Sequence, residues 1–167
     1  MTVRDATERD LPAIVAIYNA AIPGRMATAD TAQVSIESRV PWFRAHTPAS
    51  RPIWVAEADG RVPGWLSVQS FYGRPAYHRT AEVSVYVAEG HRHRGVRRGL
   101  LDEGLRRAPA LGLASLLGFI FGLNEQSLRL FAAHGFEPWA VLPRVAELDG
   151  VERDLVIVGR RLDAPGG

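Results

Sequence analysis

The spacing of apolar residues near the start of the chain predicts two helices. The first pattern follows Thr7, which is suited to cap a helix that we expect to end near Ala21, before Pro23. Its apolar residues recur at helical spacing: Leu11, Ile14, Val15, Ile17 and Tyr18. A second helical pattern covers residues 35–46 and stops at the prolines that follow.

Beyond residue 50 the pattern changes to the two-residue period of β-strands. With a short first strand, the predicted strands lie at residues 3–6, 53–58, 62–71, 80–87, 114–121, 136–148 and 151–160. Asp59-Gly60 and Asp149-Gly150 are turn sequences typical of hairpins, and we expect a bulge at Gly64. Two more helices are predicted at residues 96–111 and 127–134. The order β-α-α-β-β-β-α-β-α-β-β indicates an α/β (α+β) protein.

Length and composition narrow the class of protein. The 167 residues suffice for one domain, which we expect to span residues 1–167 with a flexible tail at the last few. The chain has no cysteine, which excludes disulfides and a cysteine nucleophile. A net charge of +2 is too small to indicate nucleic-acid binding by itself. Without an apolar run of membrane-spanning length or a signal-peptide pattern, we expect a cytoplasmic protein with no membrane partner.

The basic segment at residues 91–101, HRHRGVRRGLL, carries the strongest functional signal. It follows the strand predicted at 80–87 and opens the next helix. The first N–H groups of a helix lack intrahelical partners and the helix dipole adds positive charge, so this junction is suited to bind a phosphate. Gly95 allows the backbone to approach a ligand closely. Four arginines add formal charge: Arg92, Arg94, Arg97 and Arg98.

The element order and four segments resemble the GCN5-related N-acetyltransferase (GNAT) superfamily. The segments IYNAAI (17–22), RPAYHRTAEVSVYV (74–87), HRHRGVRRGLL (91–101) and NEQSLRLFAAHGFEP (124–138) are similar to its phosphinothricin and methionine sulfoximine N-acetyltransferase branch. The resemblance implies a GNAT fold: a mixed central sheet of about seven strands, helices on both faces, and splayed fourth and fifth strands. It also implies a homodimer that moves an acetyl group from acetyl-CoA to the amine of a small acceptor.

The same resemblance assigns residues of this chain to acetyl-CoA. In the superfamily the splayed fourth strand pairs with the pantetheine arm, which places Val85, Tyr86 and Val87 there. Asn124 matches an asparagine near the pantetheine, and Ser127 lies where a helix-capping residue is usual. The pyrophosphate is assigned to the basic turn: Arg92, His93, Arg94, Gly95, Val96, Arg97 and Arg98.

Arg97 departs from the family pattern for the pyrophosphate, which is Arg or Gln, two residues, Gly, one residue, then Gly or Ala. Arg92 and Gly95 fit this pattern, but Arg97 stands where a minimal side chain is usual. Its side chain either occupies the phosphate site or turns outward to hold the phosphates of the donor. In the first case the protein is a GNAT fold with weakened acetyl-CoA binding that serves as a binding or regulatory module.

An amine acceptor is protonated at neutral pH and must lose a proton before it attacks a thioester. Glu82 matches the glutamate of the branch and is our candidate base; strand alternation places it on the same face as Tyr86. Alternatively, Glu82 pairs with Arg74 or Arg79 and has a structural role. Backbone N–H groups at residues 85–87 are candidate donors to the oxygen that develops negative charge.

For the acceptor, the resemblance points to the loop at residues 26–30 and to the turn before the fourth strand. An arginine there can hold a carboxylate through two hydrogen bonds, and a solvated turn is the alternative place for Arg74. The assigned acceptor residues are Thr28, Arg74, Pro75, Ala76 and Tyr77.

Phe131 stands where relatives carry tyrosine or histidine and cannot donate a proton, so Tyr86 or water serves as the acid or none is used. We interpret Phe131 as a core aromatic of its helix, together with Leu128, Leu130 and Phe136.

Two other kinds of site receive less support from the sequence. His91 and His93 form an HxH pair, but no third ligand lies at metal-binding spacing, so we expect no metal. The arginine cluster has the charge for nucleic acid but lacks an interleaved aromatic platform. A basic nucleic-acid-binding domain therefore ranks third, and we expect no nucleic-acid partner.

Overall fold

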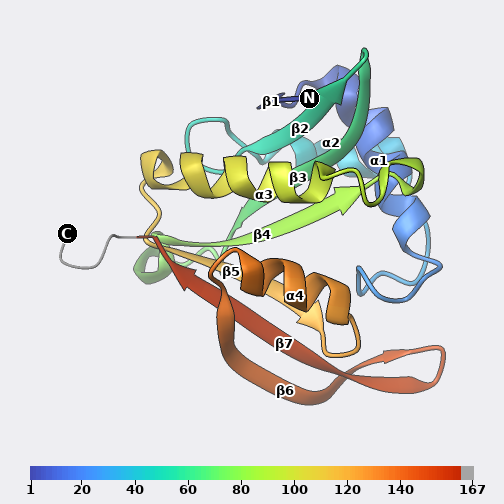
Figure 1. The fold of residues 1–167 in the computed structure, drawn as a ribbon, viewed down its shortest axis with the longest axis vertical. Coiled ribbons are helices and arrows are strands. Elements are labelled where there is room, and N and C mark those ends of the chain that lie inside the picture. Colours follow the sequence, from blue (N-terminus) through green and yellow to red (C-terminus); the bar gives the residue numbers. More distant parts are fainter. Residues whose placement is uncertain (163–167) are drawn as a thin grey trace.

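The computed structural model describes residues 1–162, and the tail predicted at the last few residues lies outside the described residues. Its centre is a mixed sheet of seven strands in the order β1-β2-β3-β4-β5-β7-β6 (Figure 1). The strands are β1 (Thr2–Asp5), β2 (Ile53–Ala58), β3 (Arg61–Ser70), β4 (Thr80–Val87), β5 (Ser115–Phe121), β6 (Glu137–Leu148) and β7 (Val151–Arg161). The predicted strands and their order along the chain are thereby confirmed.

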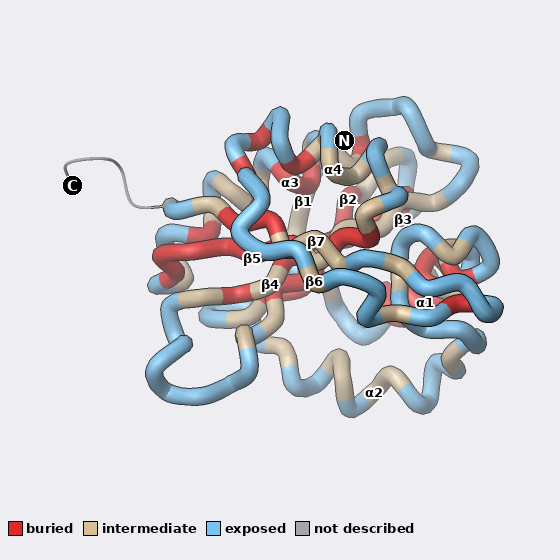
Figure 2. Tube along the Cα trace, turned by 90° about the horizontal axis from the view of Figure 1, so that it is seen from below, coloured by how far each residue is buried: buried red, intermediate tan, exposed pale blue. Residues whose placement is uncertain are grey.

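Helices cover both faces of this sheet, as the resemblance implies. Helices α3 and α4 lie on one side of the strands and α1 and α2 on the other (Figure 2). Their bounds are α1 (Leu11–Ala21), α2 (Ile36–Arg44), α3 (Val96–Arg107) and α4 (Glu125–Ala133).

Strand alternation produces a separate core on each face. Trp54 of β2 packs in the cluster under α3 and α4, whereas its neighbour Val55 packs in the cluster under α1. Residues of one strand that differ by one position point to opposite faces, so one strand contributes to both cores. The hairpin turns Asp59-Gly60 and Asp149-Gly150 have positive φ at both residues, as a two-residue turn of the predicted type requires.

The fourth and fifth strands separate along most of their length. They are parallel neighbours whose register runs only from Thr80–Ser115 to Glu82–Leu117. Beyond Glu82, β4 keeps its pairing with β3, up to Val87 opposite Gly64. The backbone of β4 from Val83 onward therefore has no partner on the β5 side, and a gap opens between the two strands.

The predicted bulge at Gly64 is displaced. The irregularity lies at residues 62–63, because Ala56 pairs with Gly64 while Ala58 pairs with Arg61. Pro63 has no N–H for the ladder, which explains the interruption. Gly64 itself is in register, and an added Cβ would lie 2.9 Å from the carbonyl oxygen of Tyr86. Its role is close packing.

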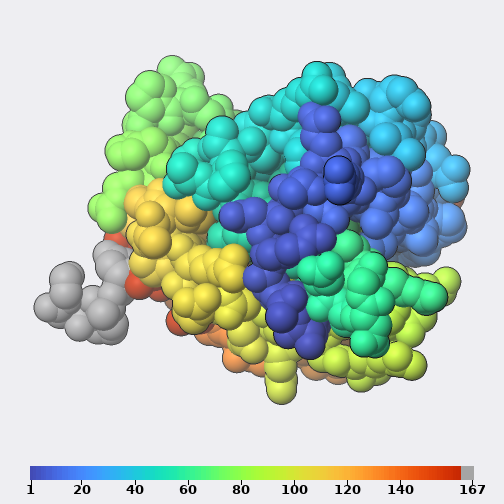
Figure 3. Space-filling model, turned by 90° about the horizontal axis from the view of Figure 1, so that it is seen from above, coloured from blue at the N-terminus to red at the C-terminus, as the bar shows by residue number. Residues whose placement is uncertain are grey.

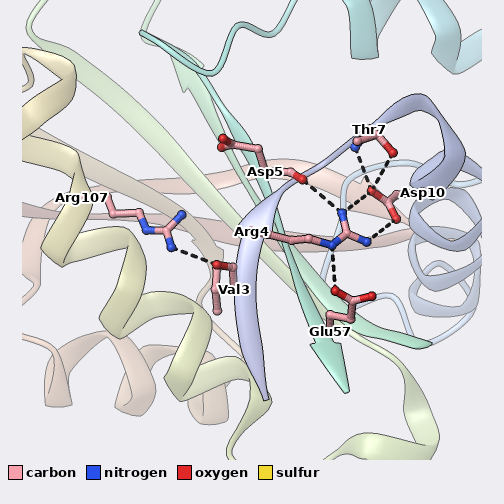
Figure 4. Close-up of polar contacts among 7 residues, drawn as sticks. All are labelled: Val3, Arg4, Asp5, Thr7, Asp10, Glu57 and Arg107. Atoms are coloured by element: carbon pink, nitrogen blue, oxygen red, sulfur yellow. Dashed lines mark hydrogen bonds and ion pairs between the residues drawn. The ribbon is translucent and has the colours of Figure 1, made fainter. Parts of the chain in front are cut away.

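An ion-pair network fixes the first strand to the start of α1 (Figure 4). The Arg4 guanidinium donates to both Asp10 carboxylate oxygens at 2.8 and 2.9 Å and to Glu57 at 2.9 Å. The Thr7 N–H donates to Asp10 at 2.8 Å, so Thr7 begins the helical segment, as predicted. Its first turn, at residues 8–10, is a 3₁₀ helix.

The start of the chain also packs against α3. Figure 3 shows the first residues (dark blue) crossing this face of the molecule beside the segment that contains α3. Arg107 donates to the Val3 carbonyl oxygen at 2.9 Å, and Met1 lies over Gly99, where an added Cβ would be 2.4 Å from the Met1 methyl group. Gly99 therefore makes room for the first strand.

Candidate active site

The gap between β4 and β5 forms the middle of a cleft. A cavity of about 420 Å³ lies there, bounded by both strands and by α4. Five of the residues predicted to bind acetyl-CoA lie on its wall: Val85, Tyr86, Arg97, Asn124 and Ser127. Thr28, predicted for the acceptor, lies on the same wall.

The cleft continues to the N-terminus of α3. A second cavity of about 490 Å³ shares Met26, Ala27, Arg97 and Asn124 with the first. Six of the seven residues assigned to the pyrophosphate line it, together with Val87: Arg92, His93, Gly95, Val96, Arg97 and Arg98. Arg94 is exposed and does not line this cavity.

Gly95 sets the geometry of this end of the cleft. It is the residue before α3 and has φ +78°, the left-handed region that side chains with a Cβ rarely adopt. The basic turn can therefore reverse direction and open α3 at Val96. The free N–H groups of the first helical turn lie beside the arginines of the same cavity.

Arg97 points into the cleft. Its Nη1 donates to the Ser127 hydroxyl oxygen at 3.4 Å, and its side chain lines both cavities. Burial, with repulsion from Arg92, lowers the pKa of the Arg97 guanidinium. Among residues 1–162 it has no carboxylate partner.

Ser127 does not cap α4, contrary to the prediction. The cap is Asn124, whose Oδ1 accepts the Ser127 N–H at 3.1 Å, and α4 begins at Glu125. Asn124 also donates from Nδ2 to the Met26 carbonyl oxygen at 3.2 Å. An Asx side chain that precedes the first turn is a better cap than a serine inside it. Asn124 thus ties α4 to the loop after α1.

Glu82 lies where the two strands begin to separate and lines two cavities on the two sides of β4. Burial raises the pKa of its carboxyl group. Within residues 1–162 the carboxylate has no hydrogen-bond or ion-pair partner. The alternative pairing with Arg79 is absent, since Arg79 donates to the Gly112 carbonyl oxygen at 3.3 Å, and Arg74 makes no ion pair with it either. A carboxylate without a partner is free to accept a proton.

A third cavity, of about 270 Å³, lies beside Glu82 on the face of the sheet that α1 and α2 cover. Aromatic rings and charged groups line it together: Tyr18, Asp30, Arg39, Trp42, Trp65, Glu82 and Tyr86. Burial raises the pKa of Tyr86, which keeps its hydroxyl protonated, and the hydroxyl donates to the Ala27 carbonyl oxygen at 3.2 Å.

Arg39 is the functional candidate in this cavity that the sequence reasoning missed. Its guanidinium lies 4.9 Å from the Tyr18 ring centre and 5.4 Å from that of Trp42, and it reaches Asp30 at 3.4 Å. Asp30 is also bound by the Tyr18 hydroxyl. The Arg39-to-Trp42 spacing of three residues, one helical turn, was the only sequence signal for it.

The predicted acceptor residues Arg74, Pro75, Ala76 and Tyr77 line none of these cavities. They form an exposed 3₁₀ turn between β3 and β4, which projects from the body of the molecule in Figure 3 (green). Pro75 starts this turn, and the Tyr77 ring packs edge-on against Phe71, with ring centres 5.5 Å apart, and at a tilt beside Tyr72. The cavity of about 270 Å³ beside Glu82 is lined by residues of α1, α2, β3 and β4, and the role of the exposed turn in acceptor binding stays a prediction.

Phe131 is a core residue, as predicted. It is buried, packs edge-on against Phe136 with ring centres 4.9 Å apart, and covers Gly118 of β5.

No group of three or more side chains in the 1–162 range is arranged to bind a metal ion. Among those same residues, no helix has the length and apolar character needed to cross a membrane.

Two parallel strands that part over a cavity, leading to a basic helix N-terminus, define the class of protein as an acyltransferase of the GNAT type. The model of the acetyltransferase (GNAT) family matches residues 14–136. The chain belongs to this family and is a GNAT-family N-acetyltransferase.

Individual relatives within the family include phosphinothricin and methionine sulfoximine acetyltransferases. The chain is 55% identical over 163 residues to the phosphinothricin acetyltransferase-type protein YwnH of Bacillus subtilis, covering 97% of this chain and 99% of that one. It is 34% identical to the L-methionine sulfoximine/L-methionine sulfone acetyltransferase of Pseudomonas paraeruginosa, covering 97% and 95%. A Salmonella typhimurium acetyltransferase structure with acetyl-CoA superposes with TM-score 0.93 at 31% identity, covering 99% and 95%.

Proposed function

We propose that the protein transfers an acetyl group from acetyl-CoA to the primary amine of a small amino-acid-like acceptor, of the phosphinothricin or methionine sulfoximine type. The observation that carries the proposal is the position of Glu82. This carboxylate, which has no partner among residues 1–162, lies on the wall shared by the cleft between β4 and β5 and the cavity under α1 and α2. A base at that point faces both substrates of a direct transfer.

The donor fits the long cleft. Its two cavities, about 420 and 490 Å³, form a continuous path from Glu82 to the basic turn. The unpaired edge of β4 is suited to the pantetheine amides, and the arginines with the N-terminus of α3 are suited to the pyrophosphate. Val85 to Val87 would hold the arm, and Arg92 to Arg98 the phosphates.

In the reaction Glu82 takes a proton from the acceptor ammonium group, and the free amine attacks the thioester carbon. A C–N bond forms as the C–S bond breaks, and the electron pair of that bond leaves on the CoA sulfur. Backbone N–H groups of β4 beyond Glu82 stabilise the negative charge on the carbonyl oxygen. The second nitrogen proton passes to the thiolate or to water. A thiol pKa of about 8.5 makes the thiolate an acceptable leaving group, so Phe131 need not supply an acid.

The acceptor occupies the cavity of about 270 Å³, with its amine toward Glu82. Arg39 lines the same cavity and is suited to bind an α-carboxylate through its planar fork. The rings of Trp42 and Trp65 bound the space left for the side chain. A positive group and a partner-free carboxylate in one small cavity match the opposite charges of an amino acid.

The test is an acetylation assay with a panel of amino-acid-like amines that includes phosphinothricin and methionine sulfoximine. We expect release of free CoA with at least one of them and weaker turnover of the matching amines that lack the carboxylate. Calorimetry with acetyl-CoA runs in parallel. Absence of acetyl-CoA binding at micromolar protein concentrations would contradict the proposal.

A second candidate function rests on Arg97. Because its side chain lies in the donor cleft, the protein is alternatively a GNAT fold with weakened donor binding that acts as a binding or regulatory module. Acceptor binding by calorimetry without any acetyl transfer would favour this candidate over the enzyme.

We also propose that the chain forms one domain and works as a homodimer in the cytoplasm, where its acetyl donor is available. The aromatic cluster of Phe71, Tyr72 and Tyr77 offers apolar surface for a second copy, because Tyr77 is exposed and Tyr72 is 79% exposed. Light scattering of the purified protein measures its mass in solution. A mass of one chain at assay concentrations would contradict the dimer.

A further inference from the structure

We infer that Arg97 is a donor-specificity residue that closes the cleft to thioesters without phosphate groups and opens it to those that carry them. This inference rests on the proposed use of acetyl-CoA. It assigns to Arg97 two positions, the one against Ser127 and a different one beside the donor phosphates.

The closed position follows from the contacts of the side chain. Arg97 is the second residue of α3, and its Nη1 reaches the Ser127 hydroxyl in α4. Helices α3 and α4 lie on the same side of the sheet (Figures 1 and 2). The guanidinium also lines both cavities of the cleft. It therefore lies where the two cavities join, beside the path that leads from the basic turn to Glu82.

Little holds the guanidinium in this position. Its contact with Ser127 is a long hydrogen bond of 3.4 Å to a neutral hydroxyl. No carboxylate among residues 1–162 compensates its charge, and Arg92 repels it. A half-buried cation without an anion is costly in free energy, so an incoming anion gains by taking it as a partner.

A phosphate provides such an anion. It accepts short, charge-assisted hydrogen bonds from a guanidinium, often two at once, and these are stronger than one bond to a hydroxyl. The phosphates of CoA would enter at the basic turn, whose cavity Arg97 already lines. When the Arg97 guanidinium releases the Ser127 hydroxyl and binds a phosphate, its side chain turns out of the pantetheine path. A neutral thioester offers no such exchange and must displace Arg97 uncompensated.

The experiment compares two donors, acetyl-CoA and S-acetylpantetheine, which carry the same thioester and pantetheine arm but differ in the phosphates. We expect Arg97→Gly to raise kcat/KM for S-acetylpantetheine about fivefold and to lower it for acetyl-CoA about tenfold. Arg97→Met keeps most of the length without the charge and is expected to lower acetyl-CoA use without that gain. Calorimetry with CoA and with pantetheine measures the same preference without turnover.

Arg106→Gly is the matched control, because it also places a glycine in α3 but at an exposed residue paired with Glu103. It is expected to leave the ratio of the two donors unchanged. If Arg97→Gly improves acetyl-CoA use, Arg97 merely obstructs the donor, and the inference is wrong. It is also wrong if S-acetylpantetheine gains nothing. If the wild-type protein prefers CoA to pantetheine as expected but acetylates no amine, the proposed reaction is wrong, while the role of Arg97 in donor specificity is supported.

Discussion

The two regions that meet at Glu82, which we propose to hold the acetyl donor and the acceptor, are built in different ways. The donor cleft is built from backbone: an unpaired strand edge, a left-handed glycine and the start of a helix, with arginines around them. The acceptor cavity is built from side chains of four elements, with aromatic rings around Arg39 and Asp30. Backbone groups suit the invariant arm of a cofactor, whereas side chains can be exchanged to suit one acceptor.

Glu82 belongs to both regions, and its loss is expected to have the largest effect. Glu82→Gln keeps the shape but cannot accept a proton, so we expect kcat to fall about 10²–10⁴-fold. Donor binding by calorimetry is expected to be unchanged. Glu37→Gln, on the exposed face of α2, is the control and keeps full activity.

The pH dependence of the same reaction has a defined sign. Burial raises the pKa of Glu82 above its ordinary 4.5, so kcat/KM is expected to fall on the acidic side at a pH above 4.5. Its ionised form is disfavoured in the fold, so the carboxylate costs stability as the pH rises through that range. Glu82→Gln should therefore unfold at the same or a higher temperature. Full activity of this variant across the pH range would remove Glu82 from the mechanism.

A substitution of Arg39 tests the proposed acceptor cavity without changing the donor cleft, because Arg39 lines only the first. Arg39→Met is expected to raise KM about thirtyfold for an acceptor with a carboxylate, the loss of one charged hydrogen-bonded contact of about 2 kcal/mol. The matching amine without a carboxylate and acetyl-CoA should be unaffected. Arg44→Met, on the same helix but paired with Glu8 at the surface, is the control. An equal rise in KM for both acceptors would contradict the carboxylate contact.

The ion pair of Arg4 and Asp10 fixes the start of α1, the helix that lines the proposed acceptor cavity. Asp10 is buried, but Arg4 is 37% exposed, so Asp10→Asn should cost about 1.5–2 kcal/mol rather than the full value of a buried pair. Arg4 holds the pKa of Asp10 below its ordinary 3.8. The stability it contributes is complete above pH 3.8 and is lost as the pH falls through the lower folded value.

Chemical denaturation at pH 7 and at pH 3 measures this contribution. The difference between Asp10→Asn and the wild-type protein should shrink at the lower pH. A difference that is the same at both pH values would show that the ion pair is not its cause.

The smallest expected effect concerns the backbone of the donor cleft. Gly95→Ala forces a Cβ into the left-handed region at a cost of about 1–2 kcal/mol, and we expect CoA affinity to fall about fivefold as the turn relaxes. Gly60→Ala has the same backbone strain at φ +71° in a hairpin far along the chain, with no atom within 4 Å of the new Cβ. It should lose similar stability but no CoA affinity.

Local chemistry explains which parts were predictable. Hairpin turns such as Asp149-Gly150, the helical pattern after Thr7 and the glycine turn before α3 depend on a few adjacent residues, and the structure contains all of them. The cap of α4 was assigned to Ser127 although Asn124 makes it, because helix starts are the least defined feature of a pattern. Family resemblance, rather than periodicity, singled out Glu82.

The acceptor side could not be derived in the same way. Arg39 and Glu82 are 43 positions apart in the sequence, and they line one cavity only because α2 packs against α1 over β3 and β4. Arg74 to Tyr77, which the resemblance assigns to the acceptor, lie on an exposed turn, and their role stays a prediction.

The order of the elements, the alternation of each strand between two cores and the basic glycine turn before a helix can all be read from the amino-acid sequence alone. These features arise from contacts over a few residues and from the alternation of side chains. Only the packing of distant elements places Arg97 in the cleft near Ser127, leaves Glu82 without a partner among residues 1–162, and brings Arg39 and Glu82 to the wall of one cavity. Those outcomes depend on which distant elements pack together, because burial and pairing are properties of the assembled chain.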